Sequence, residues 1–173
     1  MPAPPSVLAA LLAQPPALAR PGMHAVLAFR LGAEWLALPL ARLRCVTLPT
    51  ATHRIPHRNA AGLLGVTGVG GRLLPALDLG ALLGLDPCAP PSAVHRHALP
   101  RQLVLDADGQ DLVLPVADVH GVLRYHDEAL RAAPATVNHT LAPFLAGVLE
   151  HEHMAIGCLD AAALARHCRE LLR

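Results

Sequence analysis

The chain has 173 residues, of which 53% are hydrophobic and only 2% aromatic, so a single domain with a core of Leu, Val and Ala is expected. The formal net charge is +1 and every basic residue other than histidine is arginine. A net charge this small argues against nucleic-acid binding, which requires a concentrated basic face. Charged residues make up only 16%, and the apolar surface that this leaves exposed is typical of partner sites.

Cysteine usage and hydropathy bear on the compartment. The four cysteines, Cys45, Cys88, Cys158 and Cys168, include no pair with C-x-x-C spacing, and a chain of this size does not need disulfides. The apolar run Val7–Ala13 is too short to cross a bilayer and follows no Lys or Arg, as a signal peptide would require. We therefore expect reduced thiols in a cytoplasmic protein with no direct membrane insertion.

The first part of the chain changes character near residue 22. Residues 1–22 are rich in Pro and Ala and are interpreted as an extension outside the domain, which is expected to span 23–173. Alternating apolar residues predict strands over 27–31 and 36–40, with a turn at Gly32, and 43–48 continues as an extended run. Period-two alternation predicts that one face of each strand lies on the core.

The middle of the chain is rich in turn signals. Residues 50–59 are polar and are interpreted as a loop, whereas the glycines of 62–71 indicate tight turns and close backbone approach. Residues 72–77 form a strong strand pattern. Asp78 can cap a short helix that Gly84 can end. Residues 86–100, with four prolines, are expected to be a long exposed loop.

The second half repeats this style. Strands are predicted over 102–106, 111–116 and 119–125, and the Asp-Gly pair within 107–109 predicts a hairpin turn. A polar, irregular segment at 127–140 precedes a last hairpin of 145–150 and 153–159. Asp160 can then cap a helix that docks through Leu164, Cys168 and Leu171. Many short strands with Gly and Pro turns indicate an all-β fold, and the absence of alternating long helices argues against a Rossmann-type sheet.

The order of these segments resembles that of CheW-like domains. The runs FRLG, ALPL and LRCV at residues 29–46 are similar to the opening of that family. The run GVTGVGGRLLPALDL at 65–79 resembles its central G-V-x-N-x-R-G-x-x-x-P-V-x-D-L, and LVLPVADVHGV at 112–122 resembles its V-D-x-V-x-G-V, with one register difference around Asp118. Residues 146–160 resemble the closing hairpin and helix, so the similarity extends from about 23 to 167.

The resemblance implies two small five-stranded β-barrels that share a hydrophobic core, with a short mid-chain helix and a C-terminal helix. It implies no catalytic residue and no cofactor. The barrels of such adaptors present grooves to the cytoplasmic tip of a chemoreceptor and to the regulatory domain of a CheA-type histidine kinase. The tail that begins at Gly157 also resembles variant coupling proteins of surface-sensing, Wsp-type systems.

The expected partner-binding residues follow from the same resemblance and are Arg44, Val46, Val69, Gly71 and Arg72. An apolar centre with arginine at its edge is the usual composition of such a site. Three positions depart from the family pattern, because Gly68 and Gly70 replace its Asn and Arg, and Cys45 replaces its Glu. The family associates those polar residues with partner contacts. Arg72, two positions beyond Gly70, is a candidate to supply a displaced positive charge.

The eleven histidines offer an alternative function, a small metal-binding protein or metalloenzyme that uses His151 and His153. On a strand, positions i and i+2 share a face, so both imidazoles could meet one metal. A solvated hairpin tip is the favoured interpretation, because a structural zinc takes four ligands and a catalytic zinc three, and no H-E-x-x-H motif is present. His95 and His97, in the proline-rich segment, are likewise expected to be solvated. A self-assembling β-module is a third alternative.

Nucleophilic and phosphate chemistry find little support. Cys158 lies in an apolar run, where a buried thiol is inert. The only serines are Ser6 and Ser92, and no G-x-S-x-G motif is present. The glycine-rich stretch lacks the Lys and Ser or Thr of a phosphate-binding loop. We therefore expect a protein without catalytic activity.

Overall fold

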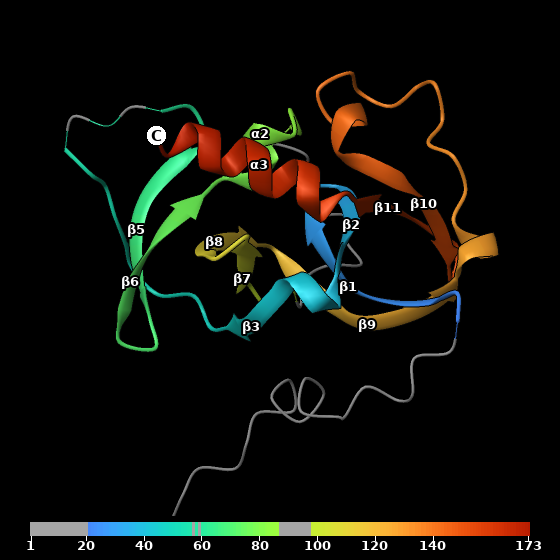
Figure 1. Cartoon of the computed structure of the whole chain (residues 1–173), viewed down its shortest axis with the longest axis horizontal. Helices are drawn as coiled ribbons and strands as arrows, with labels where there is room; N and C mark the ends of the chain where they lie inside the picture. Colours follow the sequence, from blue (N-terminus) through green and yellow to red (C-terminus); the bar gives the residue numbers. More distant parts are fainter. Residues whose placement is uncertain (1–20, 57, 59, 87–97) are drawn as a thin grey trace, which may run out of the picture.

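Two β-sheets form the molecule in a computed structural model that describes residues 21–56, 58, 60–86 and 98–173 (Figure 1). The first sheet has the strand order β10-β11-β2-β1-β9 and the second has the order β3-β7-β8-β6-β5-β4. The bounds of the elements are β1 (Met23–Leu31), β2 (Glu34–Pro39), η1 (Leu40–Arg42), β3 (Leu43–Thr47), β4 (Thr52–His53), β5 (Leu63–Val69), β6 (Arg72–Leu77), α2 (Leu79–Leu82), β7 (Arg101–Ala107), β8 (Gln110–Val116), β9 (Asp118–His126), η3 (Asp127–Ala129), η4 (Ala142–Phe144), β10 (Leu145–His151), β11 (Met154–Leu159) and α3 (Ala161–Leu171).

The all-β class is confirmed, with two differences of detail. The second sheet has six strands, because the two-residue strand β4 pairs with β5 inside the segment predicted as a loop. Residues 63–69 of the glycine-rich stretch form strand β5, so turns are confined to its ends. The proline-rich segment 87–97, with Cys88, Ser92, His95 and His97, lies outside the described residues, as do residues 1–20.

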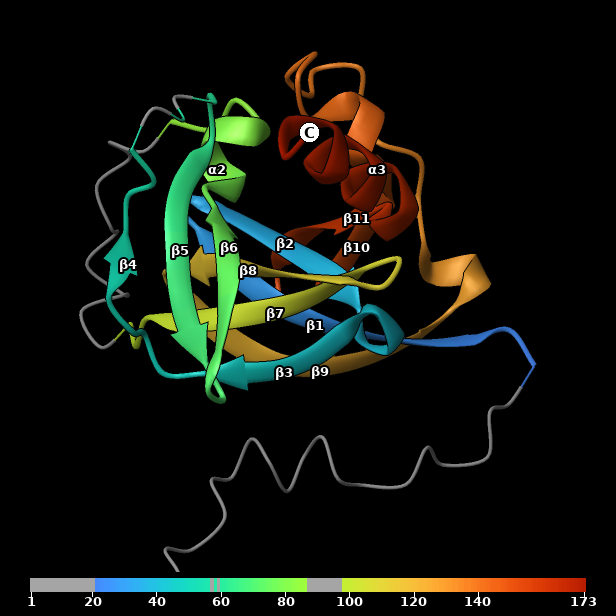
Figure 2. The ribbon, with the colours of Figure 1, turned by 60° about the vertical axis from the view of Figure 1, so that its left-hand side comes forward.

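A single large apolar cluster joins the two sheets. Leu27, Phe29 and Leu38 from the first sheet meet Leu105 and Leu114 from the second in it. Helix α3 lies across both sheets and closes this cluster (Figures 1 and 2). The shared core is therefore aliphatic, with Phe29 as its one fully buried aromatic side chain among the described residues.

Strand β1 is buried on both faces, which the alternation pattern did not predict. Leu27 and Phe29 point into the shared core, whereas Val26 and Ala28 belong to a second cluster with Leu149. Each face of β1 is covered by a separate apolar cluster, and the second cluster includes Leu149, Ile156 and Cys158 from β10 and β11. Leu27 and Phe29 therefore pack against the second sheet, and Val26 and Ala28 pack against β10 and β11.

Turn chemistry places the hairpins as the sequence predicts. Asp108 and Gly109 take positive φ values of 55° and 94° between β7 and β8. Close backbone approach occurs at Gly65, where an added Cβ would lie 2.1 Å from the carbonyl oxygen of His53. Gly65 is therefore what allows β4 to pair with β5.

Both predicted helix caps are present. The Asp78 carboxylate accepts a hydrogen bond from the Ala81 N–H at the start of α2, and Asp160 accepts from Ala162 and Ala163 at 2.9 and 3.0 Å at the start of α3. Leu164 and Cys168 are fully buried, as the docking pattern of α3 predicted. None of the described helices is both long enough and apolar enough to cross a membrane.

The cap of α3 is testable. We expect Asp160→Ala to lower the free energy of unfolding by about 1 kcal/mol, because two N–H groups lose their acceptor. This corresponds to a melting temperature lower by about 2–4 °C. Asp160→Ser, which keeps a capping oxygen, should recover most of the loss in the same thermal denaturation experiment. Equal destabilisation by both substitutions would contradict this account of the cap.

The buried thiols predict a loss of stability at alkaline pH. Burial raises the pKa of Cys158 and of Cys168 to about 11, whereas both thiols ionise near about 8.5 in the unfolded chain. The unfolded state therefore loses protons first, so stability is fully present below about pH 8.5 and declines as pH rises toward 11. Each thiol contributes roughly 2–3 kcal/mol to this decline. Urea unfolding at pH 7.5 and 10.5 measures it, and Cys168→Ala should show a smaller pH dependence than the parent chain.

Candidate partner-binding site

The five residues predicted to bind a partner all lie on the second sheet. Arg44 and Val46 are on β3, an edge strand of that sheet. Val69 ends β5 and pairs with Arg72 at the start of β6, and Gly71 lies in the turn between them. The edge strand and the tip of this hairpin are therefore the two elements that carry the candidate site.

The structure brings the two arginines together on one carboxylate. Arg72 Nη1 lies 2.8 Å from Asp111 Oδ2, and Arg44 Nε lies 3.3 Å from Asp111 Oδ1. Arg44 also reaches Asp106, with Nη2 2.7 Å from Oδ2. The Asp111 side chain is only 13% exposed, whereas Arg44 and Arg72 are 54% and 67% exposed. A mostly covered acid thus orients two solvent-facing guanidinium groups.

The positions of the acids follow from the β7–β8 hairpin. Asp106 and Asp111 are direct partners across this hairpin, and like charges facing each other destabilise a sheet unless cations neutralise them. Arg44 occupies the position where the register between β3 and β7 shifts, and its guanidinium contacts both acids. The sequence reasoning missed both acids. The predicted Asp-Gly turn already placed them opposite each other and was the available signal.

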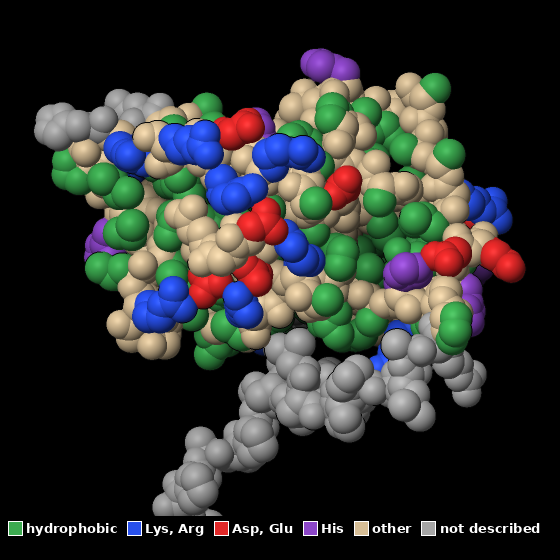
Figure 3. Space-filling view, in the orientation of Figure 1, with side chains coloured by type: hydrophobic (Ala, Val, Ile, Leu, Met, Phe, Trp, Pro, Cys, Tyr) green, Lys and Arg blue, Asp and Glu red, His purple; other side chains and the backbone are tan. Residues whose placement is uncertain are grey.

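This ion-pair cluster forms part of a mixed-charge face. Figure 3 shows blue and red side chains gathered over the part of the molecule where Figure 1 places β3 and α3. Asp108 contributes there, because it lies 2.8 Å from Arg42 and 3.1 Å from Arg169. The hydrogen bond from Arg42 and the charges of the neighbouring arginines lower the pKa of the Asp108 carboxyl below its ordinary value. This acid therefore stays ionised.

The predicted apolar centre is divided between two faces. Val69 packs against the small cluster of Leu74, Ala76, Val104 and Val113, together with Cys45. Val46 packs against the shared core on the opposite face of β3. The exposed apolar side chains nearby are instead Leu73, 73% exposed in the β5–β6 hairpin, and Leu48, 67% exposed directly after β3. Sequence reasoning did not single out either leucine.

A buried polar cluster fixes the segment that carries Leu48. Thr67 and Gln102 are almost fully buried, and both bond to Thr50: Thr50 Oγ1 lies 2.7 Å from Thr67 Oγ1 and 3.1 Å from Gln102 Oε1. Gln102 Nε2 also donates to the Thr50 carbonyl, and Thr67 donates to that of Ala51. Buried polar groups that are mutually satisfied favour one geometry. The chain after β3 is therefore held beside β5.

Comparison with known proteins identifies the family. The family model for the CheW-like domain matches residues 25–169. The chain belongs to the CheW-like domain family. A curated relative, "Probable chemotaxis protein CheW" of Rhizobium etli, is 27% identical over 143 residues, which cover 83% of this chain and 88% of that protein. The crystal structure of the scaffolding protein TtCheW from Thermoanaerobacter tengcongensis superposes with a TM-score of 0.64 at 19% identity, over 79% of this chain and 88% of that chain.

Two of the positions that depart from the CheW-like pattern, Gly68 and Gly70, differ in whether they could hold the family's residue. An added Cβ at Gly68 meets nothing within 4 Å, so asparagine fits there. Gly70 also has open space, but its φ of 56° lies in the left-handed region that disfavours an arginine. Gly70 and Gly71 together form a two-residue turn that places Arg72 opposite Val69.

Cys45 stands where the family has a glutamate. It is partly buried against the small cluster, and desolvation, followed by the negative charge of Asp111, raises the pKa of its thiol above the ordinary value. The side chain is therefore neutral near pH 7. The acidic contribution of the family's glutamate is absent from β3, and the nearby acids are Asp106 and Asp111.

The histidine motif at the last hairpin does not form as hypothesised. His151 ends β10, but Glu152 and His153 form the turn with φ values of 45° and 68°, so His151 and His153 do not share a strand face. The donor atoms that lie within 4.8 Å of one another belong to His151, Glu152 and His120 of β9. The turn therefore contradicts the alternative in which His151 and His153 bind one metal from a shared strand face, and the residue that sequence reasoning missed is His120.

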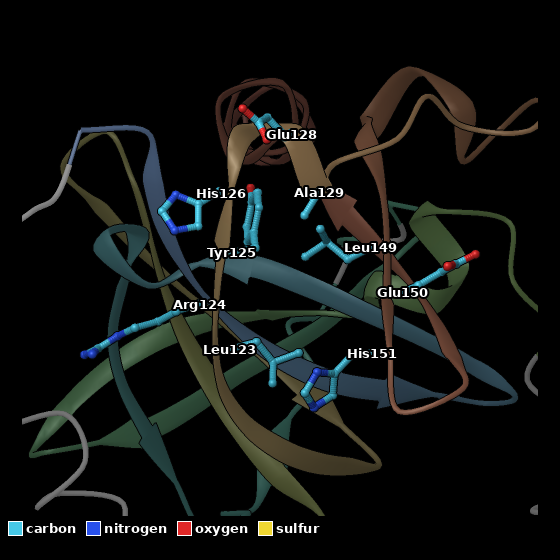
Figure 4. Close-up of a pocket in the computed structure, with 9 residues that line it drawn as sticks. All are labelled: Leu123, Arg124, Tyr125, His126, Glu128, Ala129, Leu149, Glu150 and His151. Atoms are coloured by element: carbon cyan, nitrogen blue, oxygen red, sulfur yellow. The ribbon is translucent and has the colours of Figure 1, made fainter.

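A groove of about 510 Å³ separates the two edge strands of the first sheet (Figure 4). Leu123 and Tyr125 of β9 line one side, and Leu149 and His151 of β10 line the other. The backbone of Arg131 pairs with that of Val148 on β10. The first sheet is therefore curled so that its edges face each other, and the groove is its seam.

The Asp111 cluster generates a measurable prediction. Removing its charge with Asp111→Asn should lower the pKa of Cys45 and therefore raise the rate of Cys45 alkylation at pH 8, while desolvation still holds the pKa above its ordinary value. The free energy of unfolding should fall by less than about 1 kcal/mol, because both arginines are solvent-exposed. Peptide mass spectrometry isolates the Cys45 signal. Asp106→Asn is the control and should leave this rate nearly unchanged; an unchanged rate in Asp111→Asn would place the acid away from the thiol.

Proposed function

We propose that this chain is a non-enzymatic, cytoplasmic adaptor that couples chemoreceptors to a CheA-type histidine kinase in bacterial chemosensory signalling. Membership of the CheW-like family supports this proposal, as do a relative named as a chemotaxis protein and a structural neighbour named as a scaffolding protein. The observation that carries it is the pair of exposed arginines held by Asp111 beside an edge strand.

This surface offers exposed arginine N–H groups to carboxylates of a partner. An arginine guanidinium binds carboxylates in a planar, bidentate manner, and side chains held in place before binding lose less conformational entropy when the complex forms. Asp111 supplies that orientation for Arg44 and Arg72. Leu73 adds exposed apolar area on the same hairpin. Arginine is one of the residue types that carry most of the binding energy at protein interfaces.

The backbone of β3 adds a second mode of contact. As an edge strand of the second sheet, β3 pairs with β7 alone among the described strands, so its outer side can pair with a strand of a partner. In an array, the adaptor binds receptors and kinases at the same time. Each contact is modest, but several simultaneous contacts together give a much higher overall affinity. Under this proposal the adaptor holds its partners in place and performs no chemistry.

Arg72 takes over the charge that the family pattern carries at position 70. Position 70 is a glycine in the left-handed region, whereas Arg72 starts β6 and is anchored on Asp111. The positive charge is thus retained at the same hairpin tip, moved from the turn onto the strand. The proposal assigns Arg72 and Arg44 to the kinase contact, with Val69 and Gly71 shaping the hairpin.

The proposal predicts that Arg72→Ala weakens binding to the regulatory domain of the CheA-type kinase from the same organism. We expect an increase in Kd of about tenfold, or about 1.4 kcal/mol, because an oriented arginine is lost from the interface. Isothermal titration calorimetry with the purified kinase domain measures this. Arg131→Ala is a matched control, because Arg131 is an equally exposed arginine that pairs with Glu150 on the first sheet.

Two results would contradict the proposal. If the full chain does not bind the kinase domain at all, the adaptor function is wrong for this pair of proteins. If binding occurs and Arg72→Ala and Arg44→Ala both leave Kd unchanged, the adaptor function stands but the site lies elsewhere. Circular dichroism of each variant separates loss of contact from loss of fold.

A further inference from the structure

We propose that His120, His151 and Glu152 form a site for one divalent transition-metal ion that bridges the two edge strands of the first sheet. One nitrogen or oxygen from each residue lies within 4.8 Å of the other two. Of the described residues, these are the three that bring such donors together. The site lies on the first sheet, whereas the arginine cluster lies on the second. It does not depend on the proposed adaptor function.

The donors come from separate elements that converge at the seam. His120 is on β9, His151 ends β10, and Glu152 opens the turn that follows. The imidazole rings of His120 and His151 have centroids 5.6 Å apart and an interplanar angle of 75°, and His151 Nε2 lies 4.0 Å from Glu152 Oε1. Neighbouring ligands of one ion at about 2.0–2.2 Å end roughly 3.0–3.5 Å apart. The side chains of His120 and Glu152 are exposed, so they have room to rotate toward this spacing.

The backbone on both sides of the seam is adapted to this convergence. Ala28 of β1 pairs with Gly121 and Phe29 pairs with Val119, so His120 is an extra residue in a β-bulge. Bulges re-aim a side chain relative to the regular pleat. Across the seam, the two-residue turn uses Glu152 and His153 with positive φ, where such hairpins favour Asn and Gly. The bulge at His120 and the turn at Glu152 therefore both direct metal-binding side chains toward the seam.

The chemistry of the donors selects the class of ion. Two imidazoles and one carboxylate suit Ni²⁺, Cu²⁺, Zn²⁺ or Co²⁺, whereas Mg²⁺ and Ca²⁺ require sets of oxygen ligands. Three protein ligands leave coordination positions for water or for a donor from another molecule. An ion held by β9 and β10 together would stabilise the closed seam, because it binds the folded chain and not the separated strands.

Trp35 provides a direct readout at the site. It is the only tryptophan of the chain, and its ring centroid lies 5.8 Å from that of His120 in an edge-on arrangement. A paramagnetic ion bound to His120 should therefore quench its fluorescence. The test is a titration of the full, untagged chain with NiSO₄, followed by EDTA to reverse the signal and by MgCl₂ as an ion that should not compete.

The expected result is saturable quenching at one equivalent of Ni²⁺, together with a rise in melting temperature. His120→Ala and His151→Ala should each weaken the affinity about tenfold or more and abolish the rise. Glu152→Gln should weaken it severalfold. The matched control is His153→Ala, which removes a neighbouring histidine of the same turn that is not part of the group and should leave the affinity within about twofold.

Several outcomes would overturn the proposal. These are no saturation below about 1 mM Ni²⁺, unchanged affinity in both His120→Ala and His151→Ala, or a loss caused equally by His153→Ala. Either of the first two would mean that the histidines are only solvated, or that the ion binds elsewhere. The third would assign the ion to the hairpin turn. Isothermal titration calorimetry with ZnCl₂ on the same variants checks affinity without relying on Trp35, and circular dichroism confirms that each variant is folded.

Discussion

The shared aliphatic core is the constraint on which the rest of the molecule depends. Leucines from both sheets and from α3 meet in one cluster, and Phe29 is its only fully buried aromatic side chain in the described part of the chain. Aliphatic side chains remove less area from water per residue than aromatic ones, so the chain must bury more of them. It does so by covering both faces of β1 and by laying α3 over the junction of the sheets.

Each sheet also ends in edge strands that are available for binding. The first sheet curls until β9 and β10 face each other across the groove, and the second ends at β3 and β4. Polar and charged side chains then collect along these edges. Arg44 borders β3, and His120 and His151 border the seam of the first sheet. Both candidate binding regions therefore include an edge strand that the packing of the two sheets leaves accessible.

Much of the fold could be predicted from the sequence, because turn chemistry divides the chain at the right places. The Asp108-Gly109 turn, the caps at Asp78 and Asp160 and the docking face of α3 depend on local sequence and were predicted correctly. The burial of Val26 and Ala28 was not, because the side chains that cover them come from β10 and β11, which are distant in sequence. β4 was missed for a related reason, since two residues show no periodicity and pair only because Gly65 allows close approach.

The candidate sites show the same division between local and distant information. The family resemblance indicated Arg44 and Arg72, but their link through Asp111 requires three strand pairings at once, β3 with β7, β7 with β8 and β8 with β6. Likewise, the sequence drew attention to the His151-Glu152-His153 cluster, where adjacency in the chain suggested a shared site. The turn separates His153 from His151, and the sheet's curl supplies His120 from 31 positions earlier in the chain. Histidines that are adjacent in the sequence are therefore a weak indicator of a site. Histidines on two strand edges that face each other in the fold are a stronger one.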